Sequence, residues 1–245
     1  MSPAAPLAAR NPAAKLAAAA VLTLALVVSL DPVAPAVALA AELAVVPLFG
    51  LRYGTLARRA WPLLVSVLGA VLTLFLFAQD RQQVAASALA LALRLFAVAL
   101  PGVIAFATTD PTDLADALVQ NARLPVRFAI GTLAAWRLVP LLGEEWRLIN
   151  LARRARGVDA GRNPVARLRL FVSAAFTLLV GAIRRGTRLA AAMDARGFDS
   201  GAPRTYARRQ TFGAADAALV GGAVCVAGLA LAVSVAAGAF RPLLG

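Results

Sequence analysis

Two short elements with the sequence Ala-Arg-Gly are the parts of this chain best suited to bind another molecule. They comprise Ala155, Arg156 and Gly157 in the first copy, and Ala195, Arg196 and Gly197 in the second. An arginine ends in a planar guanidinium group whose N–H donors can bind a carboxylate in a bidentate manner. Because small residues flank each arginine, its guanidinium is unshielded. We therefore predict that both elements bind acidic groups of a partner protein.

Each element also has the composition of a helix end. Glycine accepts the left-handed conformation that terminates a helix, and an arginine in the last turn complements the negative end of the helix dipole. Capping is therefore the alternative role for either copy alone. The duplication, in which Asp159 and Asp199 also correspond, favours a partner with two-fold or pseudo-two-fold symmetry.

The types of residue in the chain exclude several kinds of chemistry. There is no histidine and one cysteine, Cys225. We therefore expect no histidine-ligated metal, no histidine-dependent nucleophile and no intrachain disulfide. The chain also lacks the Gly-x-x-x-x-Gly-Lys-Ser/Thr element that binds nucleotide phosphates, so it cannot hydrolyse ATP itself. We predict no catalytic residue, no metal site and no cofactor bound by this chain.

The composition is that of a membrane protein. Of the 245 residues 61% are hydrophobic, and the mean hydropathy of +0.78 is too high for a soluble domain. The net charge is +13, which can indicate nucleic acid, anionic lipid or an acidic protein surface. Nucleic acid is the least favoured of these partners, because the basic residues are distributed as membrane topology requires.

Five apolar segments have the length of a membrane-spanning helix, which takes about 20 residues. They cover about 16–30, 33–49, 61–78, 86–107 and 214–240. The predicted fold class is therefore all-α, a polytopic membrane protein with about five transmembrane helices. We divide the chain into an N-terminal membrane domain (1–107), a cytoplasmic helical module (108–213) and a C-terminal transmembrane helix (214–245).

The basic residues between the spans orient them in the membrane. Arg10 and Lys15 precede the first span, and Arg52, Arg58 and Arg59 lie between the second and third. Loops on the cytoplasmic side carry an excess of Lys and Arg. We therefore expect a multi-pass protein whose N-terminus and helical module are cytoplasmic.

An alternative interpretation assigns residues 1–38 to a cleaved secretory signal. A basic start and an apolar stretch precede small residues at Ala34, Ala36 and Ala38, which is typical of such signals. The remaining four spans would still hold the product in the membrane.

The segment 108–213 is too long for an unstructured loop and is predicted to form three helices. Asp110 and Pro111 provide a cap and a first-turn proline for a short helix that ends near Ala122. Pro125 opens a long second helix, which ends at the first Ala-Arg-Gly element. Pro140, near its middle, is expected to kink it.

The third helix of this segment starts at Asn163-Pro164 and ends at the second Ala-Arg-Gly element. The second and third helices are both amphipathic, and residues such as Glu144 and Glu145 contribute to a polar face of the second. The apolar stretch 170–183 is too short to span a bilayer. We therefore expect a platform under or partly within the cytoplasmic leaflet.

Taken together, these motifs resemble the transmembrane T component of energy-coupling factor (ECF) transporters, a class of prokaryotic vitamin and metal-ion importers. The resemblance covers nearly the whole chain. It rests on Asn11–Leu16, Thr108–Leu114, Leu124–Pro125, Arg137–Glu145, and both Ala-Arg-Gly elements, the second within Ala192–Phe198.

The resemblance implies a non-catalytic coupling subunit in the prokaryotic inner membrane. Its two arginine-bearing helix ends would dock into two ABC-type ATPase subunits, identical or different, which use ATP and Mg²⁺. The helical module would also hold a membrane-embedded substrate-binding S component and relay the ATPase conformational change to it. The structural residues of that module would be Asp110, Pro111, Pro125, Pro140, Glu144 and Glu145.

Two charged residues lie deep inside predicted spans, Glu42 in the second and Arg94 in the fourth. Charges at such depth are costly unless they are paired or face protein or water. Either Glu42 and Arg94 form an intramembrane pair, or the spans are shifted and one side chain extends to the interface.

Two other functions are compatible with a polytopic membrane protein. One is an enzyme that acts on lipid-linked substrates, with arginines that bind phosphate. The stretch Asp194–Gly197 has a faint similarity to the signature of CDP-alcohol phosphatidyltransferases, but the further aspartates of that signature are missing. The other is a stand-alone secondary carrier, for which inverted repeats are not evident.

Overall fold

The chain folds as helices throughout the part that the structure describes. This computed structural model describes residues 5–29, 31–77, 81–158, 160–161, 163–198, 200 and 205–239, with the backbone alone at 81–83. Nine α-helices and one 3-10 helix, with no strand, are found among those residues. The all-α prediction is therefore confirmed. Asp159 and Asp199 of the sequence duplication lie outside the described residues.

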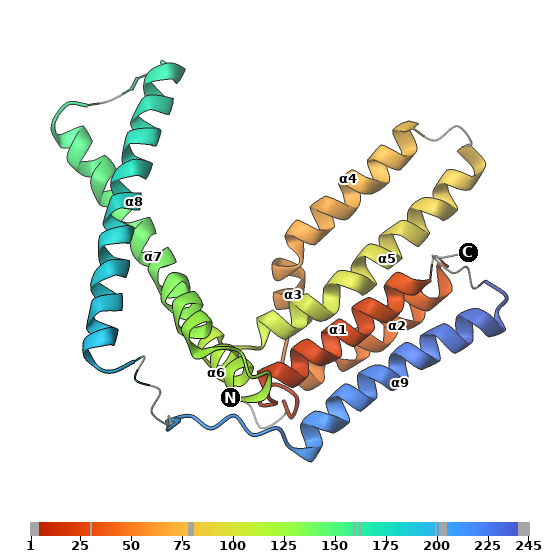
Figure 1. The fold of residues 1–245 in the computed structure, drawn as a ribbon. Helices are drawn as coiled ribbons and strands as arrows, with labels where there is room; N and C mark the ends of the chain where they lie inside the picture. Colours follow the sequence, from red (N-terminus) through yellow and green to blue (C-terminus); the bar gives the residue numbers. More distant parts are fainter. Residues whose placement is uncertain are drawn as a thin grey trace. The chain divides into compact units, whose positions relative to one another are not determined.

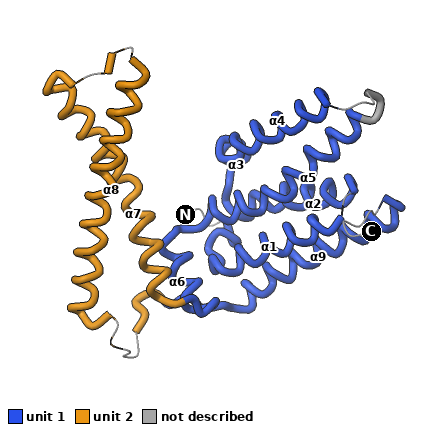
Figure 2. Tube along the Cα trace, turned by 45° about the horizontal axis from the view of Figure 1, so that its top comes forward, with its two compact units in different colours: residues 1–124, 209–245 blue, residues 125–208 orange. Residues whose placement is uncertain are grey.

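The chain divides into two compact units (Figure 2). Residues 1–124 and 209–245 form unit 1, and residues 125–208 form unit 2. This division follows packing, whereas the sequence division at 108 and 213 follows membrane topology. The two differ over the short helix after residue 108, which packs on the first helix of unit 1.

Unit 1 contains seven α-helices and a short 3-10 helix (Figure 1). They are α1 (Pro12–Val28), α2 (Val33–Val45), η1 (Val46–Phe49), α3 (Tyr53–Arg59), α4 (Trp61–Phe77), α5 (Arg81–Ala107), α6 (Pro111–Asn121) and α9 (Ala214–Ala236). Helices α1 and α2 each pack on both α5 and α9, and α4 packs on α5. Unit 1 is therefore a four-helix core of α1, α2, α5 and α9, extended by α4.

Small side chains allow the helices of this core to approach closely. One buried cluster consists of Leu26, Ala34, Ala38, Ala97 and Ala230. A second consists of Val46, Leu56, Leu100 and Ile104. Helix interfaces in membranes are enriched in small residues, because packing and not apolar burial drives helix association in lipid. The alanine-rich sequence of unit 1 thus serves close helix packing.

Unit 2 is a pair of long helices, α7 (Val126–Ala155) and α8 (Pro164–Ala195). Their ends match the predicted second and third helices. Helix α7 continues through Pro140 without a break in its helical assignment. The kink expected at Pro140 remains a prediction.

Three helices begin with the same pair of residues, an Asn or Asp followed by a proline. The starts are Asn11-Pro12, Asp110-Pro111 and Asn163-Pro164. In each, the side-chain oxygen accepts a hydrogen bond from a backbone N–H in the first turn, and the proline occupies a position that needs no N–H. The predicted starts of α6 and α8 are confirmed.

The helices agree with a polytopic membrane protein. By length and composition, α5, α7, α8 and α9 could each cross a bilayer, and Val33–Phe49 joined to α3 across a bend of 113° would make a fifth candidate. Helices α1 and α4 are apolar but have 17 residues each. Predicted span ends at residues 30, 78 and 240 lie outside the described part of the chain.

Helices α7 and α8 are thus among those long and apolar enough to cross a bilayer. The sequence prediction instead placed an interfacial platform in this part of the chain. The reason is that helix continuity extends well beyond the apolar stretch. Helix α8 has 32 residues, so an 18-residue window of high hydropathy fits inside it while its arginines lie toward its ends.

Candidate partner-binding site

The first Ala-Arg-Gly element closes α7 with a complete pair of terminal hydrogen bonds. The Val158 N–H donates to the Arg153 carbonyl at 3.0 Å, and the Gly157 N–H donates to the Arg154 carbonyl at 3.0 Å. This is the Schellman arrangement, which needs a left-handed residue after the cap. Gly157 supplies it with φ +73°, so the glycine is required by the backbone and Arg156 occupies the cap.

The second element closes α8 with the same geometry. The Phe198 N–H donates to the Met193 carbonyl at 3.0 Å, and the Gly197 N–H donates to the Asp194 carbonyl at 2.9 Å. Gly197 has φ +72°. The cap residue Arg196 has φ −90° and ψ 8°, almost the values of −92° and 10° at Arg156. The sequence duplication is therefore also a duplication of backbone geometry.

Both cap arginines are exposed and have no side-chain partner among the residues that the structure describes. Arg156 and Arg196, with the alanine and glycine on either side of each, are exposed. Neither guanidinium forms a hydrogen bond or ion pair with a described residue. By contrast, Arg153 and Arg185 of the same unit form contacts between α7 and α8. The two tips thus present planar donors that no described residue occupies.

The crossing of α7 and α8 is held by a few specific contacts. Arg185 of α8 forms an ion pair with Glu145 of α7. The rings of Trp146 and Phe171 meet edge to face with centroids 5.2 Å apart, a geometry favoured between aromatic side chains. Glu145, predicted as a structural residue, is therefore placed at the helix crossing.

A second link joins the end of α7 to α8. Arg153 donates from Nη1 to the Leu170 carbonyl at 2.7 Å and from Nη2 to the Ser173 hydroxyl at 3.0 Å. Arg153 lies three residues before Arg156 and so holds the last turn of α7 against α8. This contact fixes the base from which the Arg156 tip projects.

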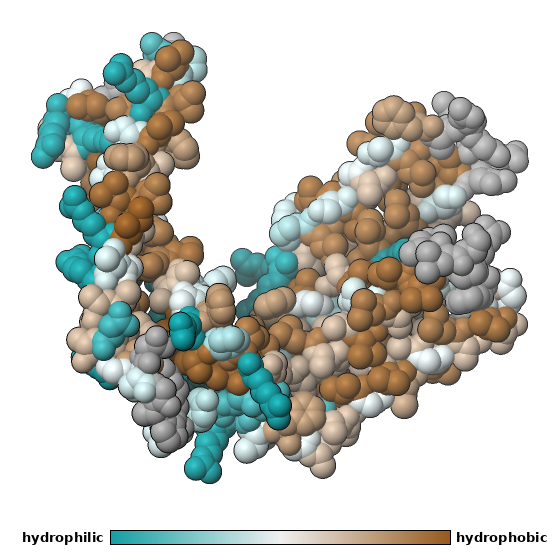
Figure 3. Space-filling model, viewed as in Figure 1, coloured by the Kyte–Doolittle hydropathy of each residue, from teal (hydrophilic) through white to brown (hydrophobic). Residues whose placement is uncertain are grey.

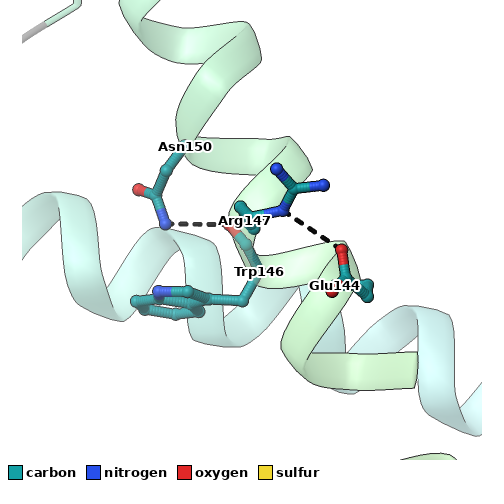
Figure 4. A network of polar contacts seen from close by, with 4 residues as sticks. All are labelled: Glu144, Trp146, Arg147 and Asn150. Carbon is teal, nitrogen blue, oxygen red and sulfur yellow. Dashed lines mark hydrogen bonds and ion pairs between the residues drawn. The ribbon is translucent and has the colours of Figure 1, made fainter. Parts of the chain in front are cut away.

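Glu144 lies on an exposed side of α7 and pairs with a residue of the same helix (Figure 4). The Arg147 Nε donates to the Glu144 carboxylate at 3.1 Å, and the Asn150 Nδ2 donates to the Trp146 carbonyl at 2.9 Å. The Glu144 and Arg147 side chains are 67% and 66% exposed. Neighbouring acidic residues Glu144 and Glu145 thus have different roles, one along α7 and one across to α8.

Unit 2 exposes a continuous apolar stripe on α8. The stripe consists of Val165, Leu168, Val172, Phe176, Leu179 and Ile183, all more than half exposed. Their spacing of three or four residues places them on one face of the helix. Together with Arg169 and Ser173, the first four line a shallow groove. Apolar side chains also cover much of the visible face of α7 and α8 in Figure 3.

The starts of α1 and α9 meet in a polar cluster of unit 1. The Asn11 N–H donates to Asp216 Oδ1 at 2.9 Å, and the Gly213 N–H donates to Asp216 Oδ2 at 2.9 Å. The Lys15 ammonium donates to the Ala8 and Thr108 carbonyls at 2.7 and 2.9 Å. We call Asn11, Lys15, Thr108 and Asp216 the anchor cluster. It ties the N-terminal segment to the chain just after α5 and to the start of α9.

Glu42 and Arg94 are not joined to one another in the structure. Arg94 donates from Nη2 to the Val27 carbonyl at 3.2 Å. Glu42 is buried, and neither of its carboxylate oxygens has a hydrogen-bond partner. The intramembrane pair is thus not formed in this conformation.

No group of three or more Asp, Glu and Cys residues within the described ranges could hold a metal ion. The thiol of Cys225 is exposed and free. The remaining predicted structural residues, Asp110, Pro111 and Pro125, stand at the starts of α6 and α7.

Several residues of the site were not found from the sequence. Nothing in the local sequence links Arg185 to Glu145, which is 40 positions away, or Asn11 to Asp216, which is 205 positions away. The one available signal was the charge itself, since a buried Asp or Lys in an apolar helix needs a partner. That signal predicts a partner without naming it.

The fold and the duplicated helix ends define an all-helical polytopic membrane protein with a separate two-helix unit. Comparison with protein families places it more narrowly. The chain belongs to the CbiQ family, described as cobalt transport protein, whose model matches residues 4–207. That match includes both Ala-Arg-Gly elements and the anchor residues Asn11, Lys15 and Thr108.

Individual relatives carry a consistent name. The chain is 35% identical over 133 residues to the energy-coupling factor transporter transmembrane protein EcfT of Limosilactobacillus fermentum, covering 51% of this chain and 50% of that protein. It is 32% identical over 141 residues to EcfT of Exiguobacterium sibiricum, covering 54% of each. It is 33% identical over 130 residues to EcfT of Bacillus subtilis, covering 50% of this chain and 49% of that protein. The chain thus matches about half the length of these curated relatives.

Proposed function

We propose that this chain is the transmembrane coupling subunit of an ATP-driven importer of the energy-coupling factor type. It receives the conformational change of two ABC-type ATPase subunits, which use ATP and Mg²⁺, and transmits it to a membrane-embedded S component that binds a vitamin or metal ion. Membership of the CbiQ family and the names of the relatives support a transport role. The chain itself is non-catalytic.

The observation that carries this proposal is the pair of equivalent arginine tips. Arg156 and Arg196 cap their helices with the same backbone geometry, are exposed, and have no partner among the described residues. A duplicated donor suits two equivalent acidic acceptors, one on each member of an ATPase dimer. Because terminal hydrogen bonds close each helix directly at its arginine, a movement of the bound ATPase would move the whole helix.

The S component is proposed to contact the apolar surface of unit 2. The stripe of α8 is too large and continuous to stay in water, and few residues of α7 and α8 are buried within the unit. Cover by an apolar protein surface, by lipid, or by both is therefore needed. In the proposed inner-membrane orientation, α7 and α8 do not cross the bilayer, although their length and composition would allow it. The N-terminus and the two arginine tips are then all cytoplasmic.

The anchor cluster is proposed to connect the chain segments that enter and leave unit 2 with the core helices of unit 1. The chain leaves unit 1 after α6 and returns just before Arg209. Within unit 1, Lys15 holds the chain at Thr108, and Asn11 and Asp216 hold the start of α9. Gln120 of α6 also accepts from the Gln210 N–H at 2.9 Å. A displacement of unit 2 is thereby passed to α1, α5 and α9.

The docking role is tested by affinity purification of the full chain from its native membranes, with co-purified ATPase subunits quantified by mass spectrometry. Arg156→Glu and Arg196→Glu should each lower ATPase recovery by about 30-fold or more. This is the factor expected when a paired interfacial charge worth at least about 2 kcal/mol is lost. The double variant should lose the ATPases while remaining in the membrane.

Arg154→Glu is the matched control, because Arg154 is exposed in the same turn of α7 and the charge change is identical. It should retain the ATPases within about twofold, as expected of an exposed charge outside the contact. Full ATPase recovery with the double variant would contradict the docking role.

A further inference from the structure

A cavity of about 400 Å³ lies among the four core helices of unit 1. This volume is in the range of small-molecule sites, which are about 300 to 1,000 Å³. Its wall is mostly apolar and includes Leu22 of α1, Ile104 of α5 and Leu219 and Val226 of α9. Cavities between helices of a bundle are common positions for bound ligands.

Three charged side chains also line this cavity: Arg10, Lys15 and Glu42. Glu42 is 6% exposed, and neither carboxylate oxygen has a hydrogen-bond partner in the described part of the chain. The Arg10 Nε is likewise buried without a partner. Burying a charge without compensation costs several kcal/mol. The cavity therefore presents unsatisfied groups of opposite sign that do not pair with each other.

The charged residues lie toward one end of unit 1. Arg10 and Lys15 stand at the start of α1, and Glu42 is near the end of α2. The anchor cluster, at the starts of α1 and α9, belongs to the same end. The cavity thus combines a zone with both charge signs at the bundle end and an apolar zone beside it, as an amphipathic ligand requires.

Exposed lining residues show where the cavity opens. They are Leu48 of η1 and Ala215, Ala218 and Gly222 of α9. All four are apolar and belong to apolar segments of a membrane protein. An apolar opening of this kind suits a ligand that enters from the bilayer.

We propose that this cavity binds an aminophospholipid, a lipid whose headgroup carries a primary ammonium and a phosphate. The ammonium donates to the Glu42 carboxylate, and the phosphate accepts from Arg10 and the remaining Lys15 donor. One acyl chain occupies the apolar part of the cavity. The lipid thereby satisfies the buried groups and links α1, α2 and α9, so it supports the end of unit 1 that carries the anchor cluster.

Charge complementarity distinguishes this occupant from other lipids. A phosphatidylcholine headgroup has a quaternary ammonium that cannot donate an N–H bond to Glu42, and a phosphatidylglycerol headgroup has no cation. A neutral, protonated Glu42 without a ligand is the competing state, and it predicts no headgroup preference. The inference does not depend on the ATPase-docking role.

The test is native mass spectrometry of the delipidated full chain, titrated with phosphatidylethanolamine, phosphatidylcholine or phosphatidylglycerol of identical acyl chains. We expect phosphatidylethanolamine to bind about tenfold or more tighter than the other two, as one charged hydrogen bond provides. Glu42→Gln should abolish this preference, and Arg10→Gln should weaken all three lipids.

Two matched pairs of variants separate the cavity from general effects. Gly222→Leu should fill the cavity and weaken every lipid about tenfold, since a side chain there meets open space. Gly221→Leu, next to it on α9 but outside the lining and equally unobstructed, should not. Asp116→Asn removes one negative charge from α6, outside the cavity, and should keep the wild-type preference.

A titration with glycerophosphoethanolamine, which has the headgroup but no acyl chains, identifies the source of the ligand. We expect no binding at the lipid concentrations used. Tight binding of this soluble compound would overturn the lipid assignment in favour of a soluble phosphoamine. Equal affinities for the three lipids in the wild type, or an unchanged preference in Glu42→Gln, would overturn the proposal as a whole.

Discussion

The two units of this protein differ in how much of their apolar surface they bury. In unit 1, 28% of the most apolar window of α5 and 22% of that of α9 are buried. In unit 2 the corresponding windows of α7 and α8 are 0% and 6% buried. Unit 1 thus has a core of its own, built on close alanine contacts. Unit 2 is held by a few polar and aromatic contacts and leaves its apolar surface for other molecules.

This difference shows that similar hydrophobicity can serve internal packing or recognition. A long apolar helix that buries almost nothing inside its own unit gains its stabilisation from lipid or from a partner. Variants should therefore change assembly when they lie on unit 2 and change folding when they lie inside unit 1.

The largest effect is expected on the α8 stripe. Phe176 lies near the middle of this stripe and is 65% exposed. It should carry much of the proposed contact with the S component, because large aromatic residues dominate interfaces. Phe176→Glu should lower recovery of the S component by about 30-fold or more, the equivalent of about 2 kcal/mol, while the ATPases stay bound. Phe176→Leu, which keeps the stripe apolar, is the control. Full S-component recovery with Phe176→Glu would place that contact elsewhere.

The next effect is expected in the anchor cluster. Asp216→Ala removes the acceptor of two backbone donors, the N–H groups of Asn11 and Gly213. An unpaired buried donor such as the Asn11 N–H costs about 1 to 3 kcal/mol, and the part-buried Gly213 N–H costs about 1 kcal/mol. The free energy of unfolding in mixed micelles should therefore fall by about 2 to 4 kcal/mol. Asp194→Ala, at an exposed position near the end of α8, should change it by less than about 0.5 kcal/mol. Equal losses would show that Asp216 has no special structural role.

A smaller effect is expected from overpacking the alanine core. Ala97 is fully buried in unit 1, and Ala97→Leu should destabilise the protein by about 1 to 3 kcal/mol. Ala191→Leu on α8 adds the same atoms at an exposed position and should be nearly neutral. Thermal unfolding of both variants in detergent checks this contrast, which fails if the two midpoints shift alike.

The smallest effects concern the two neighbouring glutamates of α7. Glu145→Gln weakens the ion pair with Arg185 of α8, in which the Glu145 and Arg185 side chains are 34% and 32% exposed. It should lower the free energy of unfolding by about 1 kcal/mol. Glu144→Gln weakens a pair within α7 that is about two-thirds exposed and should cost less than about 0.5 kcal/mol. Hydrogen exchange of the α7 and α8 amides distinguishes them, because only Glu145→Gln should accelerate exchange in both helices. Matching profiles would argue against an interhelical role for Glu145.

The sequence predicted the helices of unit 2 well because their ends are encoded locally. Asn163 and Pro164 start α8, and the two Ala-Arg-Gly elements end α7 and α8. Each signal acts within one or two turns, by a side-chain cap or by a glycine with positive φ. Such signals need no knowledge of the rest of the fold.

The contacts between helices within each unit could not be predicted in the same way. Arg185 has several acidic residues from which its partner could come, and Arg94 is bonded to the Val27 carbonyl instead of to Glu42. A helix fixes which residues share a face, but not which other helix that face meets. The choice depends on packing between segments far apart in the chain.

By itself, the sequence determined the membrane class, the helix ends and the duplicated arginine caps, because hydropathy and capping are local properties. Only the tertiary structure decided that Asn11 binds Asp216 across 205 positions, that Glu42 is buried without a partner, and that the α8 stripe is exposed. These are outcomes of how four core helices and one helix pair pack. Packing depends on all side chains at an interface together, so no single stretch of sequence contains it.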